Sequence, residues 1–195
     1  MLDMIGREVR PVVASLVVVL LLLSAGVQSA WAAATEPAGL WTGPMRGETP
    51  ETLKGAVVID LSALEALLAK KPVLLDVGLA DKKPEGFPEN RLWLPTHRSI
   101  PGATWFPGAG AGELSAEQED VLLRRVEELT QGDRSTSIVT FCRPQCWGSW
   151  NVAKRLVMKG YTGVHWFPGG IDQWQEAHDA MEVEPDMAWP SDRGL

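Results

Sequence analysis

The only two cysteines of this 195-residue chain, Cys142 and Cys146, lie in one short loop between a predicted apolar strand and a predicted helix. Backbone N–H groups converge at such a loop and favour negative charge. A thiolate placed there is stabilised, so a cysteine pKa can fall from about 8.5 to roughly 3.5–7.5. The loop is therefore the candidate seat of nucleophilic sulfur chemistry. Oxidation of the two cysteines to each other is the alternative state.

The same loop contains further residues that could shape a site or bind a substrate. These candidates are Arg143, Pro144, Gln145, Trp147, Gly148, Ser149 and Trp150. Packing between sheet and helix is an equally expected role for the two tryptophans. Asp76, at the end of another apolar segment, could position a substrate, although capping a neighbouring turn by hydrogen bonds is the simpler role for it.

Apolar segments that resemble buried strands alternate along the chain with segments of helical periodicity. Strands are predicted at residues 57–59, 72–77, within 100–106, at 138–141 and at 164–167. Two helices are predicted to begin at the capping-box patterns of residues 62–65 and 115–118. A third helix is predicted to run from the cysteine loop to about residue 160, and a short fourth one to follow Gly169 and Gly170. Residues 81–97 are predicted to form a loop and residues 108–112 to be flexible.

This alternation predicts an α/β domain with a central, mainly parallel sheet flanked by helices on both faces. Active sites in such sheets lie beyond the carboxyl ends of the strands. The cysteine loop directly follows a predicted strand. Its position in the expected fold therefore agrees with its chemistry.

The N-terminal residues have the pattern of a secretory signal peptide. Arg7 and Arg10 precede an almost wholly apolar run at residues 12–23, and small residues follow up to Ala32. The apolar run is shorter than the roughly 20 residues of a membrane-spanning helix. We therefore expect residues 1–32 to be cleaved, the protein to be periplasmic, and no stable membrane anchor to remain.

The rest of the chain divides into an extended lead-in at residues 33–54, one domain at 55–179 and a C-terminal tail at 180–195. The formal net charge of the full chain is −7. The predicted cleavage removes equal numbers of acidic and basic residues, so the mature chain keeps this charge. Because nucleic-acid-binding proteins present a basic face, nucleic acid is not an expected partner.

Four motifs occur in a defined order: Leu75-Asp76-Val77, Ile100-Pro101-Gly102-Ala103, a strand ending in Cys142, and Gly169-Gly170-Ile171 followed by Trp174. In this order they resemble the rhodanese-like domain, and the resemblance covers about residues 57–177. It implies a rhodanese-like fold. It also implies that Cys142 is the sulfur-carrying nucleophile, held as a persulfide within a loop of backbone amides.

The loop departs from the pattern of that family. The common rhodanese loop has a glycine and a later arginine, whereas this chain has Gln145, Cys146, Trp147 and Gly148 in that stretch. Alignment of Ser149 with the usual terminal serine makes the loop one residue longer. The phosphatase and arsenate-reductase branch, which has longer loops, carries an arginine where Gly148 stands. The missing cation argues against ordinary thiosulfate sulfurtransferase or phosphatase activity.

Further motifs are the segments 91–95 and 97–103, Cys146-Trp147 with Ser149-Trp150-Asn151, and Tyr161 with Trp166-Phe167-Pro168. With the signal peptide, they resemble the exported rhodanese-like proteins of the PQQ-dependent catabolism-associated CXXCW motif family. That family's label counts two residues between the cysteines, whereas this chain has three. The resemblance implies a link to alcohol catabolism that uses pyrroloquinoline quinone (PQQ). It suggests a periplasmic PQQ-dependent dehydrogenase or its cytochrome as partner, and no cofactor held by this chain itself.

Two functional hypotheses follow from the loop. In the first, Cys142 is a low-pKa nucleophile that attacks a disulfide or takes up sulfur, and Cys146 resolves the product by closing a disulfide. A permanent bridge is the alternative within this hypothesis, although so small a ring constrains little chain entropy. In the second, the fold is a catalytically degenerate binding module. Its loop tryptophans would then hold a partner protein or a quinone-like ligand.

A metal site is not predicted. The three histidines, His97, His165 and His178, are scattered, and no cysteine–histidine pair has the close spacing of a metal site. Copper(I) on the two thiolates is the remaining metal hypothesis. His97 could swing from its loop toward Cys142, but a lone histidine is more often a surface or packed residue.

Overall fold

The structure is a computed structural model that describes residues 34–81, 84–91 and 96–190. The predicted signal peptide at residues 1–32 and residues 191–195 of the predicted tail lie outside the described residues. Of the motif at 91–95, only Arg91 is described. None of the helices in the described ranges is long and apolar enough to span a membrane.

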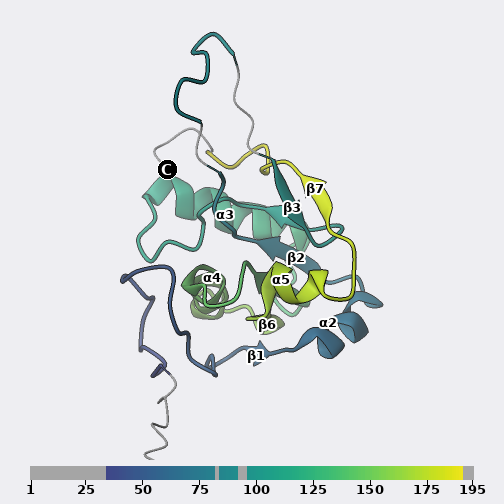
Figure 1. The fold of residues 1–195 in the computed structure, drawn as a ribbon. Helices are drawn as coiled ribbons and strands as arrows, with labels where there is room; N and C mark the ends of the chain where they lie inside the picture. Colours follow the sequence, from purple (N-terminus) through teal and green to yellow (C-terminus); the bar gives the residue numbers. More distant parts are fainter. Residues whose placement is uncertain (1–33, 82–83, 92–95, 191–195) are drawn as a thin grey trace, which may run out of the picture. The chain divides into compact units, whose positions relative to one another are not determined.

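The centre of the domain is a parallel sheet whose strand order is β1-β6-β5-β2-β4 (Figure 1). Its strands are β1 (Val57–Val58), β2 (Val73–Asp76), β4 (Thr104–Trp105), β5 (Ile138–Phe141) and β6 (Val164–Trp166). β5 lies in the middle of the sheet and is buried at every position. The predicted parallel α/β fold is therefore confirmed, and the cysteine loop follows its central strand.

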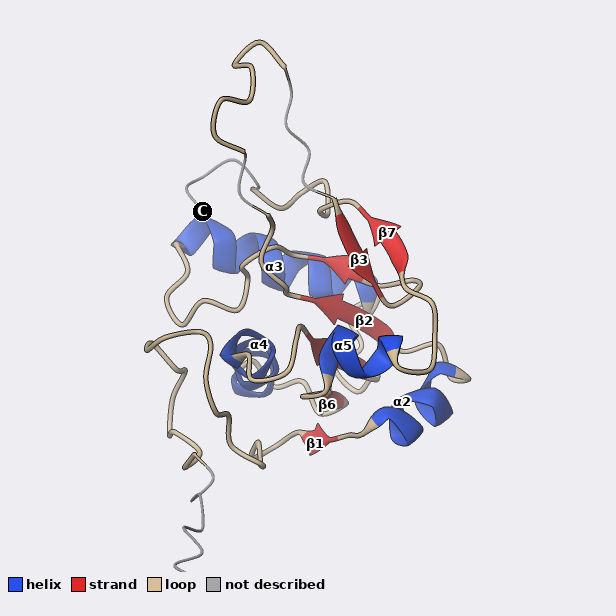
Figure 2. Ribbon diagram, in the orientation of Figure 1, coloured by secondary structure: helices blue, strands red, loops and turns tan. Residues whose placement is uncertain are grey.

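Helices cover both faces of this sheet (Figure 2). They are α2 (Leu61–Leu68), α3 (Ala116–Leu129), α4 (Trp147–Met158) and α5 (Gly170–Gln175). Successive strand residues point to opposite faces: Leu75 packs in the core with α3 and α4, whereas Leu74 packs in the core with α2 and α5. This two-sided burial explains why the strands are continuously apolar.

The helix starts confirm one predicted cap and correct another. The capping box at Ser115 is present: its hydroxyl accepts from the Gln118 N–H, and the Gln118 side chain accepts from the Ser115 N–H. The predicted box at residues 62–65 is wrong, because α2 begins at Leu61. Asp60 caps this helix instead, with its carboxylate accepting from the Ala63 N–H at 2.8 Å.

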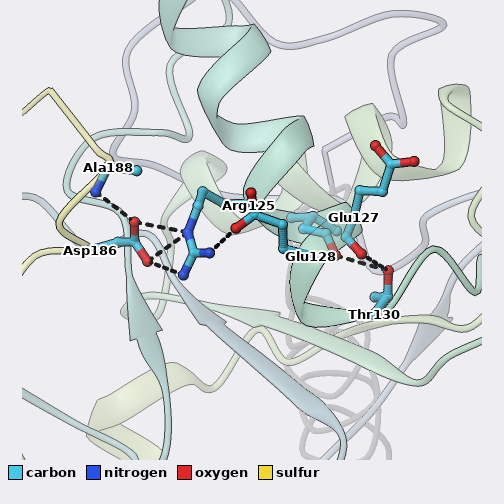
Figure 3. A network of polar contacts seen from close by, with 7 residues as sticks. Arg125, Glu127, Glu128, Thr130, Asp186 and Ala188 are labelled. Atoms are coloured by element: carbon cyan, nitrogen blue, oxygen red, sulfur yellow. Dashed lines mark hydrogen bonds and ion pairs between the residues drawn. The ribbon is translucent and has the colours of Figure 1, made fainter.

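Residues 181–190 also pack on the folded domain, although the sequence suggested a tail from residue 180. β7 (Met181–Val183) pairs antiparallel with β3 (His97–Ser99), at the end of the segment predicted to be a loop. Beyond β7, Asp186 forms an ion pair with Arg125 of α3, with Nη2 to Oδ2 at 2.9 Å, and accepts from the Ala188 N–H (Figure 3). Hydrogen bonding to Asp186 raises the pKa of Arg125.

Candidate functional site: a disulfide facing a cavity

Cys142 and Cys146 form a disulfide, with their Cα atoms 6.6 Å apart. Cys142 directly follows β5, and Cys146 is the N-cap residue of α4, where its side chain makes no capping hydrogen bond. Gln145 turns the loop with a left-handed backbone, at φ 54°. The backbone of the loop thus accommodates the oxidised state of the pair. A reactive disulfide and a structural disulfide would both have this geometry.

The two sulfur atoms have different surroundings. Cys142 is 2% exposed, and the Ser149 hydroxyl oxygen lies 3.4 Å from its Sγ. The same oxygen accepts a hydrogen bond of 3.0 Å from the indole Nε1 of Trp166, and the serine hydroxyl donates to the Cys146 carbonyl at 3.4 Å. Cys146 is only partly buried. Cys146 is therefore the more exposed residue of the pair.

A cavity of about 690 Å³ opens in front of the disulfide. The described residues that line it are Arg46, Gly78, Leu79, Ala80, Asp81, Thr96, His97, Arg98, Cys142, Arg143, Cys146, Ile171, Gln175 and Glu182. Both cysteines and Arg143 are thus where the sequence indicated. Pro144 and Gln145 form the turn of the loop, and Gly148 and Ser149 are buried in the first turn of α4, behind the disulfide.

The loop tryptophans are not among the described residues that line this cavity. Trp147 and Trp150 are 2% and 0% exposed and belong to the core under α4. Trp147 stacks on Trp41 with ring centroids 4.3 Å apart. Their burial confirms the expected packing role.

Asp76 is fully buried at the end of β2 and acts through its hydrogen bonds. Its carboxylate accepts from the Gly78 N–H at 2.8 Å and from the Ser99 hydroxyl at 2.6 Å, and contacts His97 Nε2 at 2.7 Å. The expected turn-capping role is therefore confirmed. In addition, Asp76 fixes the imidazole of His97 at the cavity wall, stacked on Trp105 at 4.4 Å.

The start of α5 lies against the cysteine loop. The Ile171 N–H donates to the Cys142 carbonyl at 2.8 Å. Gly170 has φ 54°, and a Cβ there would lie 2.4 Å from the same carbonyl oxygen. Glycine is required at this position both for its backbone conformation and for the close approach.

The lead-in is part of the site, whereas the sequence suggested an extended segment outside the domain. Its residues pair with the cysteine loop as a short antiparallel bridge between Arg46 and Cys146. The Trp147 N–H donates to the Met45 carbonyl, and the Gly47 N–H donates to the Gln145 carbonyl, each at 3.0 Å. The N-terminal segment therefore holds the loop from outside.

Buried side-chain contacts anchor this lead-in to α4. Asn151, which is fully buried, accepts from the Trp41 N–H at 2.8 Å and donates to the carbonyls of Trp41 and Gly110, each at 2.9 Å. Gly110 is also buried, because residues 108–112 pack closely against α4. Where the sequence suggested a flexible segment, the structure packs Gly110 against Gly148 of α4 and Gly112 against Trp41 of the lead-in.

Glu36 provides a second anchor for the lead-in and makes the stability of the fold depend on pH. Its carboxylate accepts from Lys154 Nζ at 3.1 Å, from the Lys54 N–H and from the Thr52 hydroxyl. Burial acts to raise the pKa of Glu36, but these hydrogen bonds and the Lys154 charge outweigh it and lower the pKa. A lowered pKa stabilises the fold above the carboxyl's ordinary value of 4.5, and this contribution is lost as the pH falls through the lowered pKa.

We predict that Glu36→Gln lowers the free energy of unfolding at pH 7 by about 1–2 kcal/mol, because charge-assisted hydrogen bonds are lost. The difference from wild type should shrink as the pH falls below 4.5, where wild type protonates the same carboxyl. Denaturant unfolding between pH 7 and pH 3 measures the loss of stability and its dependence on pH. Glu48→Gln, an exposed glutamate of the same segment, is the control. A difference that stays constant down to pH 3 would contradict the assignment.

The lining residues that were not selected from the sequence include three with basic side chains: Arg46, Arg98 and His97. His97 had a detectable signal, since it stands two positions before Ser99 and alternate strand residues share a face. Both side chains accordingly reach Asp76. Arg46 and Arg98 had no such signal. Within the described ranges, no group of three or more His, Cys, Asp or Glu side chains could hold a metal ion.

Comparison with known proteins identifies the family. The model of the rhodanese-like domain matches residues 60–177, and the chain belongs to this family. No curated protein matches the sequence. A human single-domain sulfurtransferase is 23% identical, with a TM-score of 0.40, over 64% of this chain and 99% of its own.

Another similar structure is a polysulfide-sulfur transferase homodimer from Wolinella succinogenes. It is 16% identical, with a TM-score of 0.41, over 65% of this chain and 79% of its own. An uncharacterised protein from Saccharomyces cerevisiae is 15% identical, with a TM-score of 0.37, over 62% of this chain and 92% of its own.

Proposed function

We propose that this rhodanese-like protein performs thiol–disulfide or related sulfur-handling chemistry at Cys142 and Cys146. The observation that carries the proposal is the position of the bridge, with both cysteines on the wall of a 690 Å³ cavity that has polar groups around it. Reactive disulfides are exposed to their substrates, whereas structural ones are sequestered. The same cavity admits a small thiol or a polypeptide cysteine.

The bridge is also poorly suited to a purely stabilising role. It closes a ring with a sequence separation of only four, which constrains little of the unfolded chain's entropy. The loop is already held by the hydrogen bonds of Met45 and Gly47 and by the stacking of Trp41 on Trp147. These contacts keep the loop in place without requiring the disulfide.

The burial of the sulfurs suggests an order of events. An incoming thiolate attacks Cys146 Sγ, the sulfur–sulfur bond breaks, and its electron pair leaves on Cys142 Sγ. The Ser149 hydroxyl, at 3.4 Å, can donate a hydrogen bond to this thiolate. Cys142 is then the internal nucleophile that closes the ring again and expels the bound thiol. Cys146 therefore takes the entry role that the family resemblance assigned to Cys142.

We further propose that the protein is exported to the periplasm and serves PQQ-dependent alcohol catabolism, with a PQQ-dependent dehydrogenase or its cytochrome as partner. Support comes from the signal-peptide pattern of residues 1–32 and from the presence of a disulfide, which forms in oxidising compartments. The motif shared with the PQQ-associated family also includes Ser149 and Asn151, which contact Cys142 and the lead-in.

Mass spectrometry of thiol-trapped protein from cells growing on an alcohol tests this proposal. We expect a mixture of bridged, dithiol and mixed-disulfide forms that changes with the carbon source. A redox titration of the purified protein should give a midpoint above about −300 mV, the range of exchangeable disulfides. A bridge that is complete under all growth conditions, with a midpoint far below that value, would leave only the structural role.

A further inference from the structure

The cavity in front of the disulfide is lined by more basic than acidic side chains, and one of its arginines has no ion-pair partner among the described residues. Its lining includes three arginines, Arg46, Arg98 and Arg143, and two acidic residues, Asp81 and Glu182. Arg98 stands opposite Glu182 in the β3–β7 register. Arg143 lies 3.9 Å from Asp172, just outside the cavity lining. Arg46 is exposed and forms no ion pair with any described residue.

The backbone places Arg46 beside the accessible sulfur. Arg46 and Cys146 face each other across the antiparallel bridge, and the hydrogen bonds of that bridge are made by their neighbours, Met45 with Trp147 and Gly47 with Gln145. In such a non-hydrogen-bonded pair the two side chains share one face, with Cβ atoms about 4.5–5.5 Å apart. Both side chains accordingly line the same cavity.

Contacts of neighbouring residues anchor the backbone around Arg46. The segment around it is fixed to α4 by the Asn151 hydrogen bonds and by the stacking of Trp41 on Trp147. A guanidinium is always charged and presents donors that match a carboxylate or sulfonate in a bidentate manner. The lead-in therefore supplies a cation beside Cys146, in addition to Arg143 of the cysteine loop itself.

We propose that Arg46 selects small thiols carrying a carboxylate or sulfonate as the reductants of the Cys142–Cys146 disulfide. This inference rests on the proposed thiol–disulfide chemistry. The anion binds Arg46 while the thiolate sulfur attacks Cys146 Sγ, forming a mixed disulfide there. The bond to Cys142 breaks, and Cys142 leaves as a thiolate. A second thiol then attacks the mixed disulfide, which releases the oxidised substrate disulfide and leaves the dithiol protein.

The test measures the opening of the bridge in the purified protein by three probe thiols of similar size. They are 3-mercaptopropionate, which is anionic, 2-mercaptoethanol, which is neutral, and cysteamine, which is cationic. Rates are compared per thiolate, at low and high salt. We expect the anionic thiol to react about tenfold faster than the cationic one, the lower end of the effect of a charged cleft on association. High salt should reduce this ratio.

Three variants separate the role of Arg46 from that of overall charge. Arg46→Gln should remove most of the charge preference and leave the rate with neutral thiol within about twofold. Arg46→Lys should retain the preference in part, because the charge remains. Arg124→Gln, on the exposed face of α3, removes the same charge elsewhere and should behave as wild type.

The outcomes distinguish the two proposals. A charge preference that is unchanged in Arg46→Gln, or equal rates for all three thiols in wild type, overturns the assignment of Arg46 while the thiol–disulfide chemistry stands. Failure of all three thiols to open the bridge in the native protein overturns the proposed chemistry, and the assignment of Arg46 with it.

Discussion

The free thiol of Cys142→Ser should react with iodoacetamide at least about tenfold faster than the free thiol of Cys146→Ser. In the first variant the thiol is Cys146, which lines the cavity, stands at the N-cap position of α4 and has Arg46 beside it. In the second it is Cys142, which also lines the cavity but is only 2% exposed. Mass spectrometry of samples quenched at successive times measures both rates at one pH.

The same pair of variants should differ in the mixed disulfides that they accumulate. With an added small-molecule disulfide, Cys142→Ser should keep a stable adduct on Cys146, because no second thiol is present to expel it. Alkylation of both variants in guanidinium chloride is the control, where the two rates should converge. Faster native alkylation of Cys142 than of Cys146 would make Cys142 the point of entry and reverse the proposed order.

The second large effect is expected at the contact between residues 108–112 and the start of α4. A Cβ at Gly110 would lie 2.2 Å from Gly148 Cα and 2.6 Å from its carbonyl oxygen. These are backbone atoms, so the two segments must move apart. Gly110→Ala should therefore lower the free energy of unfolding by about 1–3 kcal/mol, as overpacking of a filled interior does. It should also speed opening of the bridge, since α4 begins immediately after Cys146.

Two other glycines provide matched controls for this prediction. Gly39 has no atom within 4 Å of an added Cβ, and Gly39→Ala should leave stability and bridge opening unchanged. At Gly148 the nearest atom is Cys146 Sγ at 3.4 Å, so Gly148→Ala should have a small effect. Denaturant unfolding ranks all three. A Gly110→Ala protein within about 0.5 kcal/mol of wild type would show that this contact is looser than its geometry implies.

The parallel sheet and the placement of the cysteine loop were predictable because they depend on local patterns. A continuous apolar run such as 138–141 is typical of a strand buried on both faces, and Ser115 with Gln118 forms a box within one helical turn. The start of α2 was predicted wrongly because Asp60, and not Ser62, is the capping residue: the Asp60 carboxylate accepts from the Ala63 N–H.

The contacts that complete the site span long separations along the chain. Trp41 and Asn151 are 110 residues apart, and β7 pairs with a strand more than 80 residues earlier. No periodicity within the lead-in indicates which loop it covers, because that choice depends on the shape of the surface left by the folded domain. The domain boundaries drawn from composition missed these contacts for the same reason.

The sequence by itself determined the rhodanese-like fold, the cysteine pair at the end of its central strand and the absence of the usual cation from the loop. Those features reside in residue types and short spacings. Only the tertiary structure decided that Cys146 is the more exposed of the two cysteines and that the loop tryptophans are core residues. It also decided that Arg46 of the lead-in lies on the cavity wall beside Cys146. Burial and cross-chain pairing are properties of packing, and packing brings together residues that local patterns cannot relate.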